Sequence, residues 1–216
     1  MTPYEVFFFS SGGVEERWSE KDIGVMRANV LVGFPLGGLL SVAIAACAAV
    51  VYLPQGISVD TLGQVGLPVG MALGKIGLAI LVLGFFAATF GAACETGLST
   101  GYSLAQYGGF QWGKYVKARD AAGFHVVILL ATVIAAGVLL TGVDPVLVTE
   151  MSVVFSAIAL PLTYFPILVV ANDPDYLGEH VNGPVANALG LAYLVVIVVS
   201  AVAAIPLMII TKMGQG

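Results

Sequence analysis

Long apolar stretches separated by short polar segments make up most of this chain. Five stretches without Asp, Glu, Lys or Arg are long enough to cross a bilayer, which takes about 20 apolar residues per helix. Their length and apolar density are typical of α-helices, because membrane β-strands would read as short alternating segments. The pattern predicts an all-α integral membrane protein with a single membrane domain over residues 1–216. We expect the spans at about residues 24–53, 75–106, 121–142, 145–171 and 184–211.

The opening residues predict a further helix that is too short to span. Thr2 and Glu5 match the S/T-x-x-E capping pattern, with Pro3 at the first helical position. The simplest interpretation is a well-made helix start. The alternative is a half-helix over residues 1–13, of the discontinuous kind that lines an ion site near the membrane midplane in transporters. On that interpretation we expect the chain to begin in the middle of a broken helix.

Composition and charge placement agree with a membrane location. Charged residues make up 10% of the chain, against about 25% in soluble domains. The segments 13–27 and 107–120 hold six of the eight Lys and Arg residues. The positive-inside rule therefore predicts a multi-pass protein of the cell membrane with both segments cytoplasmic. The few scattered cations do not form the basic patch that nucleic-acid binding needs.

Polar side chains inside the spans are the candidates for a transport pathway. Glu95 is expected well inside the second long span, where a carboxylate is costly unless it faces a partner or water. Its alternative is a protonated acid bonded to neighbouring hydroxyls. Thr163 and Tyr164 lie between Pro161 and Pro166, which either bend one helix around a polar path or are absorbed by neighbouring helices.

The sequence does not favour catalysis. It contains no nucleophile–base pair, no P-loop and no His-Glu-x-x-His pattern. Cys47 and Cys94 are far apart inside apolar stretches, so a disulfide or a metal cluster is not expected. We therefore predict neither an enzyme nor a resident cofactor.

Several motifs resemble the Nramp divalent-metal transporters, and the resemblance covers essentially the whole chain. In the position of the family's Met-Pro-His and following Asn, this sequence has Thr2-Pro3-Tyr4-Glu5. The similarity is more specific later in the chain, where order and spacing match the family's tenth helix and the loop after it. The matching segments are Ala159–Pro166, Asn172-Asp173, Leu177-Gly178, Asn182-Gly183-Pro184 and Asn187, with Leu98–Gln106 similar to its eighth helix.

The resemblance implies a fold and a function, which the departures from the family then modify. It implies the second inverted repeat of a LeuT-like transporter plus one extra helix, with Thr2 and Glu5 as metal ligands. Thr2 replaces a methionine thioether by a hard oxygen, which favours Mg²⁺ and Mn²⁺, as in the Nramp-related magnesium transporter branch. Tyr4 and Phe9 stand where the family has histidines, so transport without proton coupling is expected.

The resemblance also implies that the chain is the carboxy-terminal half of a transporter. The family's Asp-Pro-Gly-like first helix does not occur here, and the family site forms between two inverted repeats. We expect the missing amino-terminal half to come from the same gene or from a separate chain, and the bilayer and a divalent ion to be the other partners. The alternative function is a non-transporting membrane subunit or scaffold that pairs with a separate chain.

Overall fold

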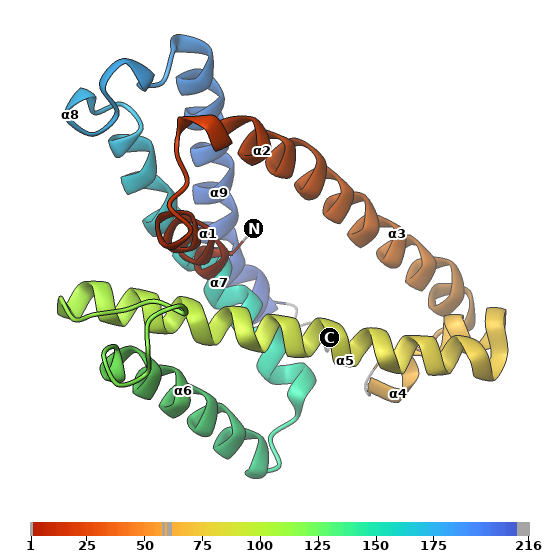
Figure 1. Cartoon of the computed structure of the whole chain (residues 1–216). Coiled ribbons are helices and arrows are strands. Elements are labelled where there is room, and N and C mark those ends of the chain that lie inside the picture. Colours follow the sequence, from red (N-terminus) through yellow and green to blue (C-terminus); the bar gives the residue numbers. More distant parts are fainter. Residues whose placement is uncertain (1, 58, 60–61, 211–216) are drawn as a thin grey trace. The chain divides into compact units, whose positions relative to one another are not determined.

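The computed structural model of the protein describes residues 2–57, 59 and 62–210, and all regular secondary structure in these ranges is helical (Figure 1). The α-helices are α1 (Pro3–Glu15), α2 (Ile23–Ala28), α3 (Phe34–Tyr52), α4 (Leu62–Val65), α5 (Leu67–Gly108), α6 (Ala122–Leu140), α7 (Pro145–Val170), α8 (Pro174–Leu177) and α9 (Pro184–Ile210). Short 3₁₀ segments lie at Glu20–Asp22, Leu53–Gln55 and Gly178–His180, and a π-helix lies at Asn29–Gly33.

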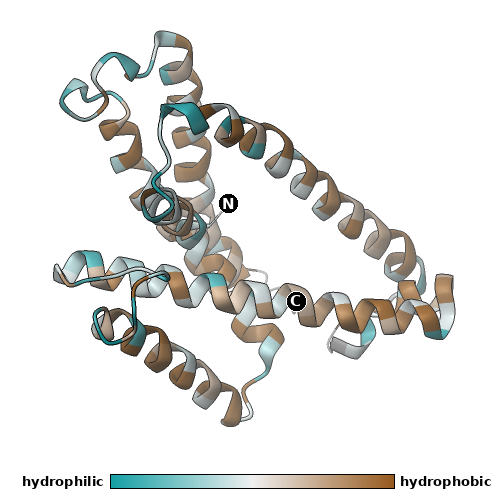
Figure 2. Cartoon of the chain, in the orientation of Figure 1, coloured by the Kyte–Doolittle hydropathy of each residue, from teal (hydrophilic) through white to brown (hydrophobic). Residues whose placement is uncertain are grey.

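Five helical segments are long and apolar enough to cross a membrane. They are Glu20–Gln55, Leu67–Gly108, Ala122–Leu140, Pro145–Val170 and Pro184–Ile210. Apolar colour predominates on these helices, with paler and hydrophilic turns towards the carboxyl end of α5, and hydrophilic colour gathers in the connecting segments (Figure 2). The prediction of an all-α integral membrane protein with a short amino-terminal helix is confirmed.

The chain forms two compact units, and each is described by itself. Unit 1 combines the residues up to Phe7 with those from Ile134 onward, and unit 2 is Phe8–Val133. The division falls inside α1 and inside α6, so neither helix belongs wholly to one unit.

In unit 1, α7 and α9 form a closely packed helical hairpin. Asp144 caps α7, since its carboxylate accepts the Val146 N–H at 3.0 Å. A Cβ added at Gly190 of α9 would lie 2.8 Å from Leu168 Cδ1 and 3.3 Å from the Tyr164 hydroxyl of α7. The missing side chain thus permits the close approach of the two helices.

The core of unit 2 lies where the end of α5 meets the start of α6. The buried residues Tyr102, Ala105, Ala121 and Phe124 pack together there. A Cβ at Gly101 would lie 2.8 Å from both Phe124 and Ile128, so α6 packs directly on this glycine. Gly101 is therefore one of the small residues in α5 that a neighbouring helix requires.

The first span is a continuous helix that widens before a proline. Pro35 near the start of α3 has no N–H for the preceding turn and its ring would clash with that turn in a regular α-helix. The backbone of Asn29–Gly33 instead forms a π-helix, with hydrogen bonds one residue longer than in an α-helix. The local widening accommodates the ring without breaking the span.

The second span differs from its simplest expectation at its start. The sequence placed the start of this span near residue 75, but residues 67–73 are already helical, with Pro68 in the first turn. The helix is then broken at Gly74, whose φ of 59° and ψ of −146° are non-helical. Only glycine adopts this combination readily, so Gly74 marks the point where the long span begins.

Candidate functional site

The first turn of α1 brings together the two residues that the sequence proposes as metal ligands. The Thr2 N–H donates to Glu5 Oε2 at 2.6 Å, within a partly buried environment. This is one half of the predicted capping box, because the third helical residue accepts from the residue before the helix. The capping prediction is therefore correct for the Glu5 carboxylate.

The other half of the capping box is not made. Thr2 Oγ1 is buried and has no hydrogen-bond partner. A buried hydroxyl without a partner is destabilising, since it has lost its hydrogen bonds to water. Helix capping therefore accounts for the position of the Glu5 carboxylate but not for that of the Thr2 hydroxyl. The hydroxyl oxygen has no hydrogen-bond partner and lies beside a negatively charged carboxylate.

Such a pair can contribute hard ligands to a cation. Hydroxyl and carboxylate oxygens suit Mg²⁺ and Mn²⁺ better than soft metals. Among the residues that the structure describes, no group of three or more His, Cys, Asp or Glu side chains is arranged to hold a metal. Thr2 and Glu5 thus offer two side-chain oxygen ligands and not a complete metal site.

Thr163 and Tyr164, both in α7, have local contacts that account for part of their polarity. Thr163 Oγ1 donates to the Ala159 carbonyl one turn earlier, at 3.4 Å, and both Thr163 and Tyr164 are half-buried. The Tyr164 ring packs edge-on against Tyr193 of α9, with ring centroids 5.0 Å apart. The α-helix continues through Pro161 and Pro166, so neither proline ends the helix.

The remaining pathway candidates belong to different helices and different units. Tyr4 lies in the part of α1 that belongs to unit 1, and Phe9 lies in the part that belongs to unit 2. The Phe9 ring contacts Trp18 edge-on at a centroid distance of 5.4 Å. Glu95 is half-buried within α5. Their roles in ion passage stay predictions.

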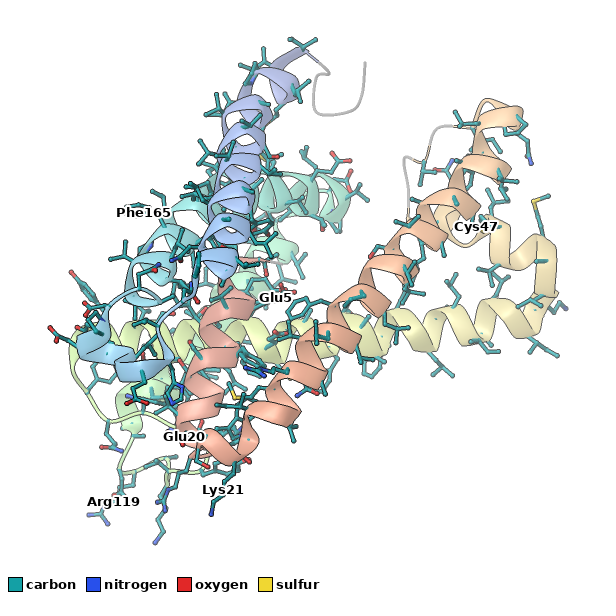
Figure 3. All side chains as sticks on the ribbon, turned by 90° about the horizontal axis from the view of Figure 1, so that it is seen from above. Glu5, Glu20, Lys21, Cys47, Arg119 and Phe165 are labelled. Carbon is teal, nitrogen blue, oxygen red and sulfur yellow. The ribbon has the colours of Figure 1, made fainter. Side chains whose placement is uncertain are left out.

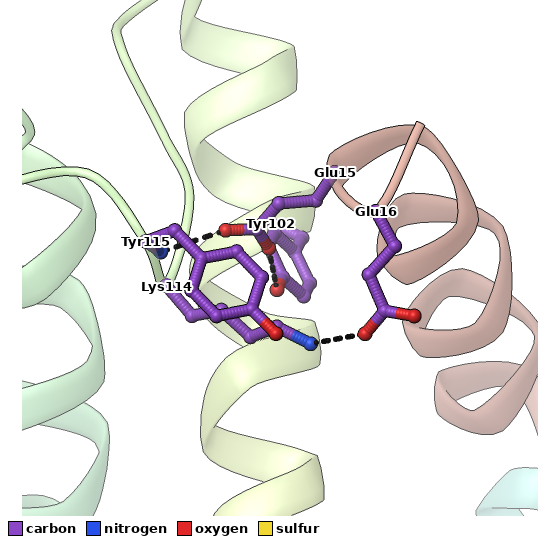
Figure 4. A network of polar contacts seen from close by, with 5 residues as sticks. All are labelled: Glu15, Glu16, Tyr102, Lys114 and Tyr115. Atoms are coloured by element: carbon purple, nitrogen blue, oxygen red, sulfur yellow. Dashed lines mark hydrogen bonds and ion pairs between the residues drawn. The ribbon is translucent and has the colours of Figure 1, made fainter. Parts of the chain in front are cut away.

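The structure contains a polar cluster that sequence reasoning missed, at the carboxyl end of α1 (Figure 4). One oxygen of Glu15 accepts the hydroxyl of Tyr102 in α5, and the other accepts the Tyr115 N–H at 2.9 Å. The Tyr102 side chain is 1% exposed. One turn earlier in α1 and one turn later in α5, Gln106 Nε2 donates to the buried Ser11 hydroxyl at 2.9 Å.

An ion pair lies beside this cluster, on the exposed side. Lys114 Nζ is 2.8 Å from Glu16 Oε1 and lies 4.9 Å from the centre of the Tyr115 ring. The hydrogen bond from Lys114 lowers the pKa of the Glu16 carboxyl below its ordinary value. The same bond raises the pKa of the Lys114 ammonium, so both groups are charged at neutral pH.

A faint signal of the cluster was present in the sequence. Ser11 and Glu15 are four residues apart, as are Tyr102 and Gln106, and residues at this spacing share a helix face. Two such polar pairs in otherwise apolar helices can face one another. Nothing in the sequence indicated which helices meet, because the pairs are about ninety residues apart.

Together, the spans and the first turn of α1 define the class: a multi-pass helical membrane protein whose short helix presents a buried, unused oxygen donor next to a carboxylate. The family model for natural resistance-associated macrophage protein-like (Nramp) proteins matches residues 1–206. The chain therefore belongs to the Nramp family, whose members transport divalent metals and are not enzymes. No curated protein and no solved structure matches the chain.

Proposed function

We propose that the protein transports Mg²⁺, Mn²⁺ or both across the cell membrane, with Thr2 and Glu5 among the ion's ligands. The observation that carries this proposal is Thr2 Oγ1, which is buried and has no hydrogen-bond partner beside the Glu5 carboxylate. Membership of a divalent-metal transporter family supports the class of cargo. The ion enters and leaves as substrate and is not a resident cofactor.

The choice of ion follows from the donor atoms. A thioether ligand would favour soft transition metals, whereas the hydroxyl and carboxylate oxygens of Thr2 and Glu5 favour hard ions. Mg²⁺ also retains several of its waters when it binds to proteins. A site with two protein side chains and water is compatible with that preference.

We further propose that transport is driven by the ion gradient without proton coupling. The family's histidines are replaced here by Tyr4 and Phe9, as the resemblance places them, and histidine is the side-chain type that ordinarily exchanges a proton near neutral pH. The edge-on contact of Phe9 with Trp18 gives its ring a packing role instead. Uptake should not respond to an imposed pH gradient.

Two donors from this chain do not complete the coordination of a divalent ion, which takes about six ligands. We propose that the further ligands come from a first repeat carrying the acidic broken helix of the family, encoded in the same gene or in a separate chain. The membrane is the other partner. Pro184–Ile210 and the other four candidate spans would cross it.

For orientation, we propose that segments 13–27 and 107–120 face the cytoplasm. Figure 3 shows Lys21 and Arg119, one from each segment, at the same end of unit 2, while Cys47 of α3 lies far from that end. A shared side for both cationic segments fits the positive-inside rule.

The test is uptake of Mg²⁺ and Mn²⁺ into liposomes that contain the protein produced from its own genomic locus with any chain that co-purifies. Glu5→Gln is the informative variant, because glutamine still accepts the Thr2 N–H and preserves the cap but removes the charge. We expect uptake to fall at least about tenfold, as loss of a charged ligand costs more than about 1.4 kcal/mol. Glu16→Gln, which removes an exposed carboxylate, is the control.

Uptake that Glu5→Gln leaves unchanged would restrict Glu5 to capping and remove it from the ion site. If the parent protein catalyses no uptake of either ion in any combination of chains, transport is the wrong function. The non-transporting subunit or scaffold would then be the better interpretation, and its partner could be identified by crosslinking in the native membrane.

A further inference from the structure

The carboxylate of Glu15 is held by hydrogen bonds from two parts of the chain and has a glycine beside it. It receives one hydrogen bond from a helix, through the Tyr102 hydroxyl, and one from a loop, through the Tyr115 N–H. A Cβ added at Gly113 would lie 3.0 Å from Glu15 Oε1, and Gly113 has a φ of 133°. The loop thus uses a glycine both for its backbone conformation and for room next to the carboxylate.

Side chains, rather than closely packed backbones, connect α1 to α5. Over the described residues, the backbones of these two helices hardly approach each other, in contrast to those of α7 and α9. The polar links are Glu15 to Tyr102 and Ser11 to Gln106, and Phe8, two turns before the end of α1, also packs against the core cluster. A connection made of hydrogen bonds can open with less loss than interdigitated apolar packing, because water replaces each lost partner.

These links lie near the carboxyl end of α1, so this end of the helix is the part that would separate from α5. α1 has 13 residues, about 20 Å of helix, and it ends immediately after Glu15. The chain then reverses at Arg17, whose φ of 56° is in the left-handed region. Glu15 is itself half-buried, so water can reach the carboxylate as the end of α1 moves away. The buried Tyr102 stays with the core of unit 2.

From these observations we infer that Glu15 and Tyr102 form a reversible latch that holds the carboxyl end of the half-helix against α5 on the side proposed to be cytoplasmic, and that this latch opens when an ion is released. The latch is closed in this structure. The opening step rests on the proposed transport function, whereas the latch itself does not. Glu15 and Tyr102 are positioning residues in this scheme and do not contact the ion.

Distances between two spin labels test the latch without requiring transport. Val14 of α1 is 68% exposed and Tyr107 of α5 is 94% exposed, so labels at these positions disturb little. The native Cys47 and Cys94 are both exposed and are replaced by alanine first. The labelled protein is reconstituted in liposomes with the chains that co-purify with it. In the parent we expect one narrow distance distribution.

Glu15→Gln should broaden this distribution towards longer distances, because glutamine offers one acceptor oxygen where the carboxylate offers two. Glu16→Gln is the matched control: it removes the neighbouring carboxylate, which pairs with Lys114 of the loop and not with α5, and should leave the distribution as in the parent. An unchanged distribution in Glu15→Gln overturns the latch. Equal broadening in both variants overturns it as well, since the effect would then be one of charge alone.

If the Glu15→Gln protein does not fold, Tyr102→Phe tests the latch instead. Phenylalanine keeps the ring packing against Trp112 and Phe124 but loses the hydroxyl, and it should also lengthen the label distances. A folded Tyr102→Phe protein with the parent's distances overturns the latch.

Ion uptake by the unlabelled variants then separates this inference from the proposed function. We expect Glu15→Gln to raise the KM for external Mn²⁺ at least about threefold relative to Glu16→Gln, because loss of a hydrogen bond to a charged group biases the resting state towards the open side. A KM equal to that of the control overturns the role in release. If the label distances respond but the parent shows no uptake, the latch stands and the transport function fails.

Discussion

At residue 2, the backbone and the side chain differ in their hydrogen bonding. The backbone N–H of Thr2 serves the cap, since it donates to Glu5. The hydroxyl does not, because Oγ1 is buried without a partner. This separation of roles allows the side chain to be changed while the backbone half of the cap remains, which makes Thr2 the best position for testing selectivity.

Thr2→Met should shift selectivity from Mg²⁺ towards Mn²⁺ and Cd²⁺. A thioether is a softer ligand than a hydroxyl, and the substitution also removes the buried hydroxyl that has no partner. We expect the ratio of Cd²⁺ to Mg²⁺ uptake to rise by about tenfold, the equivalent of about 1.4 kcal/mol. Competition of Cd²⁺ and Mg²⁺ for Mn²⁺ uptake in liposomes measures the ratio.

Thr2→Ser is the control for that measurement, because serine retains the hydroxyl and the capping N–H. Its selectivity should equal that of the parent. A ratio that is the same in Thr2→Met, Thr2→Ser and the parent would show that the side chain of residue 2 does not contact the ion.

At the scale of helices, glycines in one span serve different purposes. α5 contains glycines where an added Cβ would collide with a neighbour, as at Gly101, and others where it would meet nothing within 4 Å, as at Gly84 and Gly91. Gly74 serves a third purpose, because its backbone conformation breaks the helix. The density of glycines therefore indicates that another helix can approach closely, but it does not indicate at which glycine the contact is made.

Gly101→Ala should destabilise the α5–α6 contact. The new methyl group would lie 2.8 Å from Phe124 and Ile128, and overpacking of this kind costs about 1–3 kcal/mol. Gly91→Ala is the control, since the helix propensity of alanine favours it by up to about 1 kcal/mol and nothing in the chain obstructs it. Thermal unfolding in detergent, followed by circular dichroism, compares the two variants.

We expect the midpoint of Gly101→Ala to fall below that of the parent and the midpoint of Gly91→Ala to equal or exceed it. A Gly101→Ala protein as stable as the parent would mean that α6 can move aside, and that its contact with α5 is not close-packed in the membrane.

For the whole molecule, the sidedness of the loops can be tested directly. In a background in which alanine replaces Cys47 and Cys94, single cysteines at Ser19 and Gln111 should react with a membrane-impermeant maleimide only after cells are opened. A cysteine at Gln55, the last residue of the first span, should react in intact cells. Reaction of Ser19 and Gln111 on opposite sides would contradict the topology derived from Lys and Arg placement.

The sequence predicted features that depend on composition or on near neighbours. The spans follow from hydropathy, and the Thr2–Glu5 contact follows from a spacing of three. Features that depend on which helices meet could not be predicted. Glu15 and Tyr102 are 87 residues apart, and no local pattern distinguishes Gly101, on which α6 packs, from Gly91. The free Thr2 hydroxyl also needed coordinates, because the sequence pattern implies a complete capping box.

The π-helix at Asn29–Gly33 also affects how the length of this chain can vary. One π turn holds an additional residue compared with an α turn. The residues after the turn therefore lie on the same helix faces that they would occupy in a regular α-helix with one residue fewer. In a span without Pro35, deleting one residue among Val30, Leu31 and Val32 would convert the turn to regular α-helix with both faces retained. Homologous spans that are one residue shorter at this position should therefore align face to face on either side of the gap, and the gap belongs inside the helix rather than in a loop.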